Sequence, residues 1–310
     1  MLGRIAAVAL HNYRESVRAR ILLGLAGVAF AVAFYSLVIG AYTLHHAARV
    51  VSDLGAATIS LFSIAVAVLI GATSLHRELE QKTIFPILAR PIRRSEYLVG
   101  KYLGTLLTLA VFIMADAGLV LLISAALADR PLALVIGVGL ALTAGLGFAV
   151  TRSRWARTFG PIPWSLLLLV AGAWLSSPAP EERRVVLAAS LLAFFEVAIV
   201  AAIASLFSAF STPFLSALLT LGVVVVGRNA DTLAHYPAKV YGQTLHDAAA
   251  LVAHVWPNLH VYVPPRPLLL GEAVGVDLGA YLAMAALAAI AWSAGLLAVA
   301  SFIFKKRDFL

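Results

Sequence analysis

Long apolar runs recur along the whole chain and restrict its fold more than any other feature. A helix needs about 20 mostly apolar residues to cross the hydrocarbon core of a bilayer. A transmembrane β-barrel would instead show alternating segments of about 10 residues, and the sequence has none. We therefore predict an all-α integral membrane protein with about eight transmembrane helices. The predicted spans are residues 21–43, 54–75, 102–127, 132–150, 159–176, 186–208, 213–227 and 279–304.

The composition supports this class and excludes several kinds of chemistry. The chain is 62% hydrophobic and 12% charged, with a mean hydropathy of +0.96, whereas soluble domains are about 45–50% apolar and about 25% charged. It has no cysteine, which excludes disulfides, thiolate metal sites and cysteine catalysis. The first apolar run is longer than the core of a signal peptide, so we expect it to be retained as the first span.

The distribution of basic residues predicts the orientation. Placing both termini in the cytoplasm puts 16 of the 23 lysines and arginines on the inside, as the positive-inside rule requires. The net charge of +8 is then explained by topology, and we predict no nucleic-acid partner. We predict a multi-pass protein of the bacterial inner (cytoplasmic) membrane, with both termini cytoplasmic.

Several segments are not expected to span. Residues 1–20 predict an interfacial helix, residues 76–100 a cytoplasmic segment, and residues 228–278 an external loop. The stretch from Ser208 to Pro213 is either a tight turn or a kink, because proline disfavours helix just before it. We favour the turn, which keeps the C-terminal tail on the basic side.

The cytoplasmic segment combines charge with a short apolar face. Charged residues between Arg77 and Lys82 precede the apolar residues of 84–88, and prolines and further basic residues follow. Such a helix could lie along the membrane surface or offer its apolar face to a groove on a soluble partner. A solvated loop that only fixes topology is the third interpretation, and the residues alone leave all three open.

The order of residues in this segment resembles the hallmark of type-2 ABC exporter permeases. That hallmark is an acidic pair, a Gly or Lys, a Thr, a short apolar helix, a Pro and a G-K-x-x-G. Here these are Glu78 and Glu80, Lys82, Thr83, Ile84 to Leu88, Pro91, and Gly100-Lys101 with Gly104. The runs Asn12–Glu15, Phe207–Gly227, Pro257–Leu259 and Phe304–Asp308 are also similar to the family, so the resemblance covers both ends and the centre of the chain.

The resemblance implies a single permease domain over residues 1–310, with a six-helix core and residues 132–178 as an inserted hairpin. It implies a non-catalytic chain that binds no cofactor, and the sequence agrees in lacking a phosphate-binding P-loop. ATP and Mg²⁺ would lie on a soluble ABC ATPase, present in two copies, beside a second permease chain, in a homodimer or in a heterodimer with a similar chain. The implied coupling helix, residues 77–90, would dock on that ATPase through Glu78, Glu80, Lys82, Thr83, Phe85, Leu88 and Arg90.

Two acidic residues, Asp116 and Glu196, lie inside predicted spans. Acids at this depth are costly and usually face the bundle interior. We expect the two to lie at similar depth, with no Lys or Arg at that level. Each is then protonated, hydrogen-bonded to a neighbouring helix, or part of a cation or proton site; the position of Glu196 resembles a recurrent family acid. We predict no metal site, because the external histidines have neither an i, i+4 pair nor a carboxylate motif.

Two other functions compete with an exporter. An ion-driven secondary transporter would show an inverted repeat with broken helices, and we find none. An intramembrane enzyme would need more than Asp116 and Glu196, and the spans hold neither a histidine nor a G-x-S-x-G motif. The sequence names no substrate: lipids, glycans, drugs and peptides all fit the resemblance.

Overall fold

The computed structural model describes residues 2–43, 46–80, 93–128, 130–235, 243–244, 247, 251, 256–273 and 275–306. All regular structure in these ranges is helical, as expected where the bilayer offers no water to backbone groups. The elements are α1 (Leu2–Arg18), α2 (Arg20–Ala41), α3 (Ala47–Glu80), α5 (Arg94–Leu127), α6 (Leu132–Arg152), α7 (Arg154–Phe159), α8 (Pro161–Leu175), α9 (Pro180–Ser208), α10 (Pro213–Arg228), α11 (Ala230–Ala234), η1 (His260–Tyr262), α14 (Arg266–Leu270) and α15 (Leu278–Lys306).

Each of the eight predicted spans coincides with one helix, and the all-α membrane fold is confirmed. Within the described ranges, six helices are long and apolar enough to cross a membrane: α2, α3, α5, α6, α9 and α15. The other two, α8 and α10, have 15 and 16 residues, fewer than the approximately 20 that a perpendicular crossing needs. In contrast, α3 and α5 have 34 residues each and extend beyond the predicted 54–75 and 102–127.

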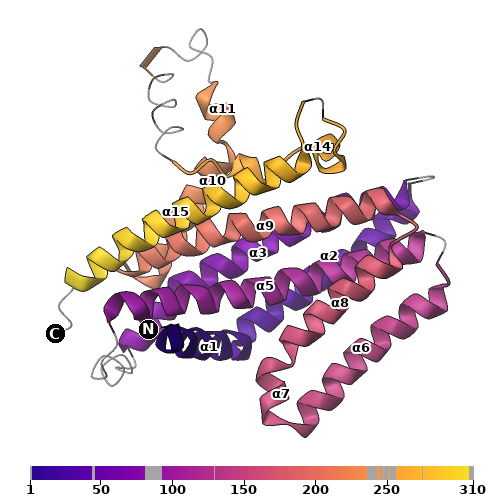
Figure 1. The fold of residues 1–310 in the computed structure, drawn as a ribbon, viewed down its shortest axis with the longest axis horizontal. Helices are drawn as coiled ribbons and strands as arrows, with labels where there is room; N and C mark the ends of the chain where they lie inside the picture. The colour runs from indigo at the N-terminus through magenta and orange to yellow at the C-terminus, as the bar shows by residue number, and fades with distance from the viewer. Residues whose placement is uncertain are drawn as a thin grey trace.

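The core of the bundle is formed by α3, α5 and α9, which run side by side (Figure 1). Both chain ends lie at one end of the bundle, called here the terminal side; α5 begins and α15 ends there. The opposite side is where α5 ends and α9 begins. Small residues let the helices approach closely, as is usual in membranes: a Cβ on Gly71 would lie 2.5 Å from Ala204 Cβ, and one on Gly55 would lie 2.4 Å from Val120 Cγ1.

The chain reverses direction between α9 and α10, so the segment from Ser208 to Pro213 is a turn and not a kink. Helix α9 ends at Ser208 and α10 begins at Pro213, which occupies the first helical turn, where its missing N–H costs nothing. Ser211 and Ser216 hydroxyls share a hydrogen bond of 2.7 Å across the turn. The last residue of α10 then contacts α9 twelve residues before its end.

The residues predicted as an inserted hairpin form α6, α7 and α8, which stand to one side of the bundle (Figure 1). Helix α8 packs along α5, where the backbones meet at two glycines: a Cβ on Gly118 would lie 2.7 Å from Leu168 C, and one on Gly172 would lie 2.7 Å from Gly118 O. Helix α6 has one buried residue, Val135, and Val138 and Leu142 pack beside it against α5 and α8; most of its other side chains are exposed.

Replacing Gly118 by alanine should therefore weaken the attachment of the hairpin. The new methyl group meets backbone atoms that cannot rotate away, and overpacking of this kind costs about 1–3 kcal/mol. We expect G118A to lower the thermal unfolding midpoint of the detergent-solubilised protein. G137A in α6 is the matched control, because a Cβ there meets nothing within 4 Å. Equal midpoints for the two variants would contradict the proposed contact.

Candidate functional site

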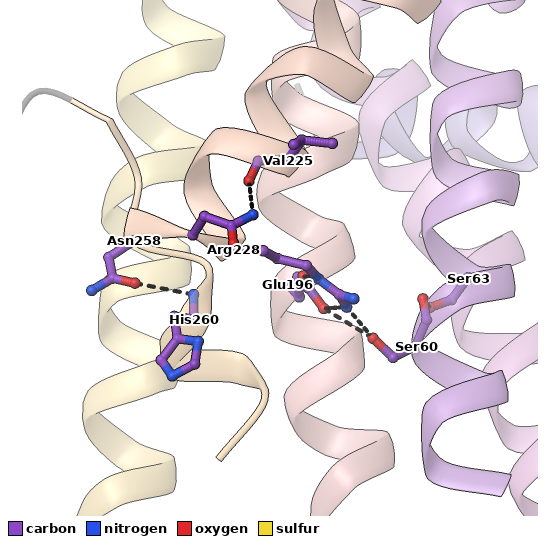
Figure 2. Close-up of polar contacts among 8 residues, drawn as sticks. Ser60, Ser63, Glu196, Val225, Arg228, Asn258 and His260 are labelled. Carbon is purple, nitrogen blue, oxygen red and sulfur yellow. Dashed lines mark hydrogen bonds and ion pairs between the residues drawn. The ribbon is translucent and has the colours of Figure 1, made fainter. Parts of the chain in front are cut away.

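A polar cluster lies inside the bundle where α3, α9 and α10 meet (Figure 2). Arg228 forms a two-pronged ion pair with Glu196: Nε donates to Oε1 at 2.8 Å and Nη2 donates to Oε2 at 2.9 Å. Ser60 donates to Glu196 Oε2 at 3.2 Å and accepts from Arg228 Nη2. The Glu196 side chain is fully buried, while that of Arg228 is 29% exposed. The cluster neutralises the acid and joins three helices.

The prediction that no Lys or Arg lies at the depth of Glu196 is wrong. We assigned Arg228 to the external loop, but α10 has only 16 residues and rises about 24 Å at 1.5 Å per residue. It therefore ends close to the level of Glu196, and the long arginine side chain spans the remaining distance to the carboxylate. The sequence carried one signal: the apolar run 213–227 is the shortest of the eight, and Arg228 follows it directly.

The energetics favour a structural interpretation of Glu196 over an ion site. A buried carboxylate without a partner is far too costly to remain charged in an apolar medium, and Arg228 and Ser60 supply the partners. The charge of Glu196 is already balanced by Arg228, so the carboxylate has no unpaired charge with which to bind a transported cation. Removing one partner of such a pair typically costs about 3–5 kcal/mol.

The segment after residue 256 covers the cluster. Leu259 N–H donates to Gly227 O at 2.9 Å, and a Cβ on Gly227 would lie 2.7 Å from Pro257 O, so glycine is what permits the close approach. Tyr262 donates to Ala285 O at 3.1 Å. Burial, with the Glu196 carboxylate as a second cause, raises the pKa of Tyr262 to about 12, which keeps this hydroxyl a donor.

The other intramembrane acid, Asp116 of α5, is in a different situation. Its side chain is fully buried, and neither carboxylate oxygen has a hydrogen-bond partner within the described residues. Gly55 of α3 contacts Val120 of α5. Measured from that contact, Ser60 and Asp116 are about 7.5 Å and 6 Å toward the terminal side. The two acids thus lie at similar depth, and an unpaired acid in this environment fits only as the neutral form.

A second polar group, which the sequence did not reveal, ties the helices together on the opposite side. Arg266 of α14 forms an ion pair with Asp53 and a hydrogen bond of 3.2 Å with Ser52, both in α3. It also lies 3.7 Å from Glu182 of α9. A cleft of about 400 Å³ opens beside this arginine, between the starts of α3 and α9.

On the terminal side, the G-K-x-x-G of the sequence lies in α5 and forms the seat of α1. A Cβ on Gly100 would lie 2.7 Å from Val8 Cβ, and one on Gly104 would lie 2.4 Å from Ala9 O. Asn12 donates to Lys101 O at 2.8 Å. These glycines belong to a helix–helix contact, a role that the spacing alone did not indicate.

The start of α5 is also attached to the end of α15. Arg94 donates to the carbonyl oxygens of Phe304 at 3.3 Å and Lys305 at 3.0 Å. The rings of Tyr97 and Phe304 stack with centroids 6.5 Å apart. Helices α1 and α15 therefore both pack on the start of α5, immediately after residues 81–92, and this three-helix contact is called here the joint.

The predicted ATPase-coupling residues remain predictions. Lys82, Thr83, Phe85, Leu88 and Arg90 lie outside the described residues, and Glu78 and Glu80 lie on the last turns of α3 with side chains that are also outside them. In the described part of the chain, no group of three or more His, Cys, Asp and Glu residues is arranged to hold a metal.

The ion pair makes a quantitative prediction. R228Q leaves a buried carboxylate without its cation and should lower the unfolding midpoint by at least about 5 °C. E196Q/R228Q removes both charges and should recover a large part of that loss. The test is a double-mutant cycle of midpoints for E196Q, R228Q and the double variant, in one detergent. Additive effects would show that the two side chains are not coupled.

Asp116 should respond differently from Glu196. D116N replaces a neutral acid by a neutral amide of the same shape, so we expect an unfolding midpoint within about 2 °C of the parent. Thermal unfolding of D116N beside E196Q checks this expectation. A loss in D116N as large as that in R228Q would mean that the Asp116 carboxylate is charged and paired.

Comparison with known proteins agrees with this geometry. Residues 6–309 match the family model described as ABC-2 family transporter protein, while no curated protein matches the chain in sequence. The match covers nearly the whole chain, including α1, both acids, the cluster at Arg228 and α15, and it confirms the resemblance drawn from the sequence. The chain therefore belongs to the ABC-2 transporter family, as a multi-pass, non-catalytic membrane subunit of an ABC transporter.

Proposed function

We propose that this chain is the permease of an ATP-driven exporter and that a separate soluble ABC ATPase docks on residues 76–100. The supporting observation is that α3 ends and α5 begins within that segment, on either side of residues 81–92. The apolar run of α3 ends at Leu75, yet the helix continues to Glu80, about 7.5 Å further. Helix α5 resumes at Arg94. The two ends of the segment thus belong to two long helices, and both of these ends lie at the terminal side of the bundle.

The contacts of these helices provide a route for mechanical coupling. Displacement of residues 81–92 would move the end of α3 and the start of α5 together. The start of α5 carries α1 through Gly100 and Gly104 and the end of α15 through Arg94. The other helix, α3, is bound to α9 and α10 through Ser60 and its ion-pair partners. Packed helices of this kind respond to a push by rocking between discrete arrangements.

The terminal side is the cytoplasmic side in this proposal. It holds Arg4, Arg14 and Arg18 of α1, together with Arg93 and Arg94, which is the basic side that the positive-inside rule assigns to the cytoplasm. Both termini are then cytoplasmic, in a bacterial inner membrane. ATP and Mg²⁺ would bind only to the ATPase, of which two copies would act on two copies of this chain.

The cluster at Arg228 disfavours an ion-driven secondary transporter. Such a transporter needs a site that gains and loses a cation at the membrane midplane, and Glu196 is occupied by Arg228. Asp116 alone would have to serve. The classes of substrate that remain are those that the family resemblance implied: lipids, glycans, drugs, peptides or similar cargo.

Charge reversal on the last turns of α3 tests the proposal. E78K/E80K should abolish transport and the stimulation of ATP hydrolysis in proteoliposomes that contain the permease and its ATPase, because the acids would no longer match the docking surface. E181K/E272K makes the same change in charge at exposed positions on the opposite side and should leave both activities intact. If both activities survive E78K/E80K, the docking assignment is wrong.

A further inference from the structure

The turn of the α6–α8 hairpin carries a concentrated positive charge. Residues 131–179 contain three basic residues, Arg152, Arg154 and Arg157, and no Asp or Glu. All three side chains are exposed. Arg154 and Arg157 are three positions apart and therefore share one face of α7. Neither of them forms an ion pair or hydrogen bond with the described part of the chain.

The sequence builds a fixed elbow at this turn. Helix α6 ends at Arg152, and Ser153, in an extended conformation, caps α7 by accepting a hydrogen bond from Ala156 N–H at 3.4 Å. Gly160 then separates α7 from α8, which begins at Pro161. A Cβ on Gly160 would lie 2.4 Å from Ala156 O, so a larger residue would disturb this connection. The arginines are thus held on a short, ordered helix.

Helix α1 adds two more arginines to the same surface. Tyr13 stacks on Phe159 of α7 with ring centroids 6.2 Å apart, and Arg18 Nη2 lies 3.5 Å from Thr158 Oγ1. Arg14 is exposed one turn before Arg18. We call the surface formed by Arg14, Arg18, Arg152, Arg154 and Arg157 the basic elbow.

One acid, Glu15 of α1, lies at the edge of this surface, because it is three positions before Arg18 on the same helix. Glu15 also lines a cleft together with Asn12, Val66 and Thr73. The basic elbow therefore carries five arginines on α1, α6 and α7 with one acid at its edge, and its net charge is positive. Such a patch attracts a ligand with several negative oxygens.

The surroundings identify that ligand as a lipid headgroup. Trp155 of α7 is 66% exposed, and so is Phe148, whose ring lies 5.4 Å from the Arg152 guanidinium. Exposed aromatic residues of this kind mark the boundary between hydrocarbon and headgroups. The adjoining face of α6 is apolar and exposed through Leu140 and Ile136, which suits acyl chains. A soluble anion would gain nothing from these apolar side chains.

We propose that the basic elbow binds the phosphate of anionic phospholipids in the adjoining leaflet, which is the cytoplasmic one in the proposed topology. Arginine suits this ligand because its guanidinium donates two parallel hydrogen bonds to phosphate oxygens. A bound headgroup would bridge α7 and α1, and through α1 it would contact the joint at the start of α5. The proposal does not depend on ATPase coupling or on the identity of the cargo.

Native mass spectrometry of the detergent-solubilised full chain tests the proposal with added phosphatidylglycerol or phosphatidylcholine. We expect phosphatidylglycerol to bind preferentially, and R154Q/R157Q to weaken it about five-fold for each arginine removed. R154K/R157K should keep most of the binding. R49Q/R183Q removes two exposed or partly exposed arginines from the opposite side and should leave it unchanged. Equal binding of the two lipids, or equal losses in both glutamine variants, would overturn the proposal.

A fluorescence measurement gives an independent result with a variant that does not change the charge of the protein. Brominated phosphatidylglycerol should quench the protein's tryptophan emission more strongly than brominated phosphatidylcholine, and W155F should remove that difference. No difference in the parent protein would overturn the proposal. If R154Q/R157Q keeps its phosphatidylglycerol but loses a co-purifying ATPase, the elbow is a protein-docking surface and the lipid proposal is wrong.

Discussion

The ion pair between Glu196 and Arg228 is the interaction on which the rest of the bundle depends. A carboxylate near the middle of a membrane helix must be neutralised within the protein, because neither water nor lipid tails can do so. Arg228 meets this requirement only because α10 turns back at residues 209–212 and ends after 16 residues. The ion pair therefore requires that α10 return alongside α9 and end near Glu196, and Ser60 joins the pair to α3.

Much of the architecture follows from patterns that are local in the sequence. Apolar runs give the helices, and Pro213 after a short polar stretch gives the turn, because these depend on neighbouring residues alone. The partners of the polar groups do not follow. Arg228 and Glu196 are 32 positions apart, and Ser60 and Arg228 are 168 apart. Helix periodicity says nothing about which of several antiparallel neighbours a residue will meet.

Glycines illustrate the same limit. The sequence singled out Gly100 and Gly104 only through a family resemblance, which placed them beside a coupling segment. Their physical role becomes clear from the contact with α1, because a Cβ added at either position would clash with that helix. The glycines of α6 look equivalent in the sequence, yet Gly137 and Gly145 meet nothing within 4 Å. What separates the two sets is the neighbouring helix, and single-sequence patterns do not carry that information.

The contacts of α3 and α5 bear on the proposed coupling. Helix α3 is fixed to its neighbours at three levels: Gly71 against Ala204, Ser60 against Glu196, and Asp53 against Arg266. Helix α5 is fixed to α1 through Gly104 and to α8 through Gly118. In the chain, residues 81–92 connect the end of α3 to the start of α5. A force applied there would act on both helices at once, and their shared core with α9, in which Tyr102 of α5 donates to Ala198 O at 3.3 Å, would pass it to the rest of the bundle.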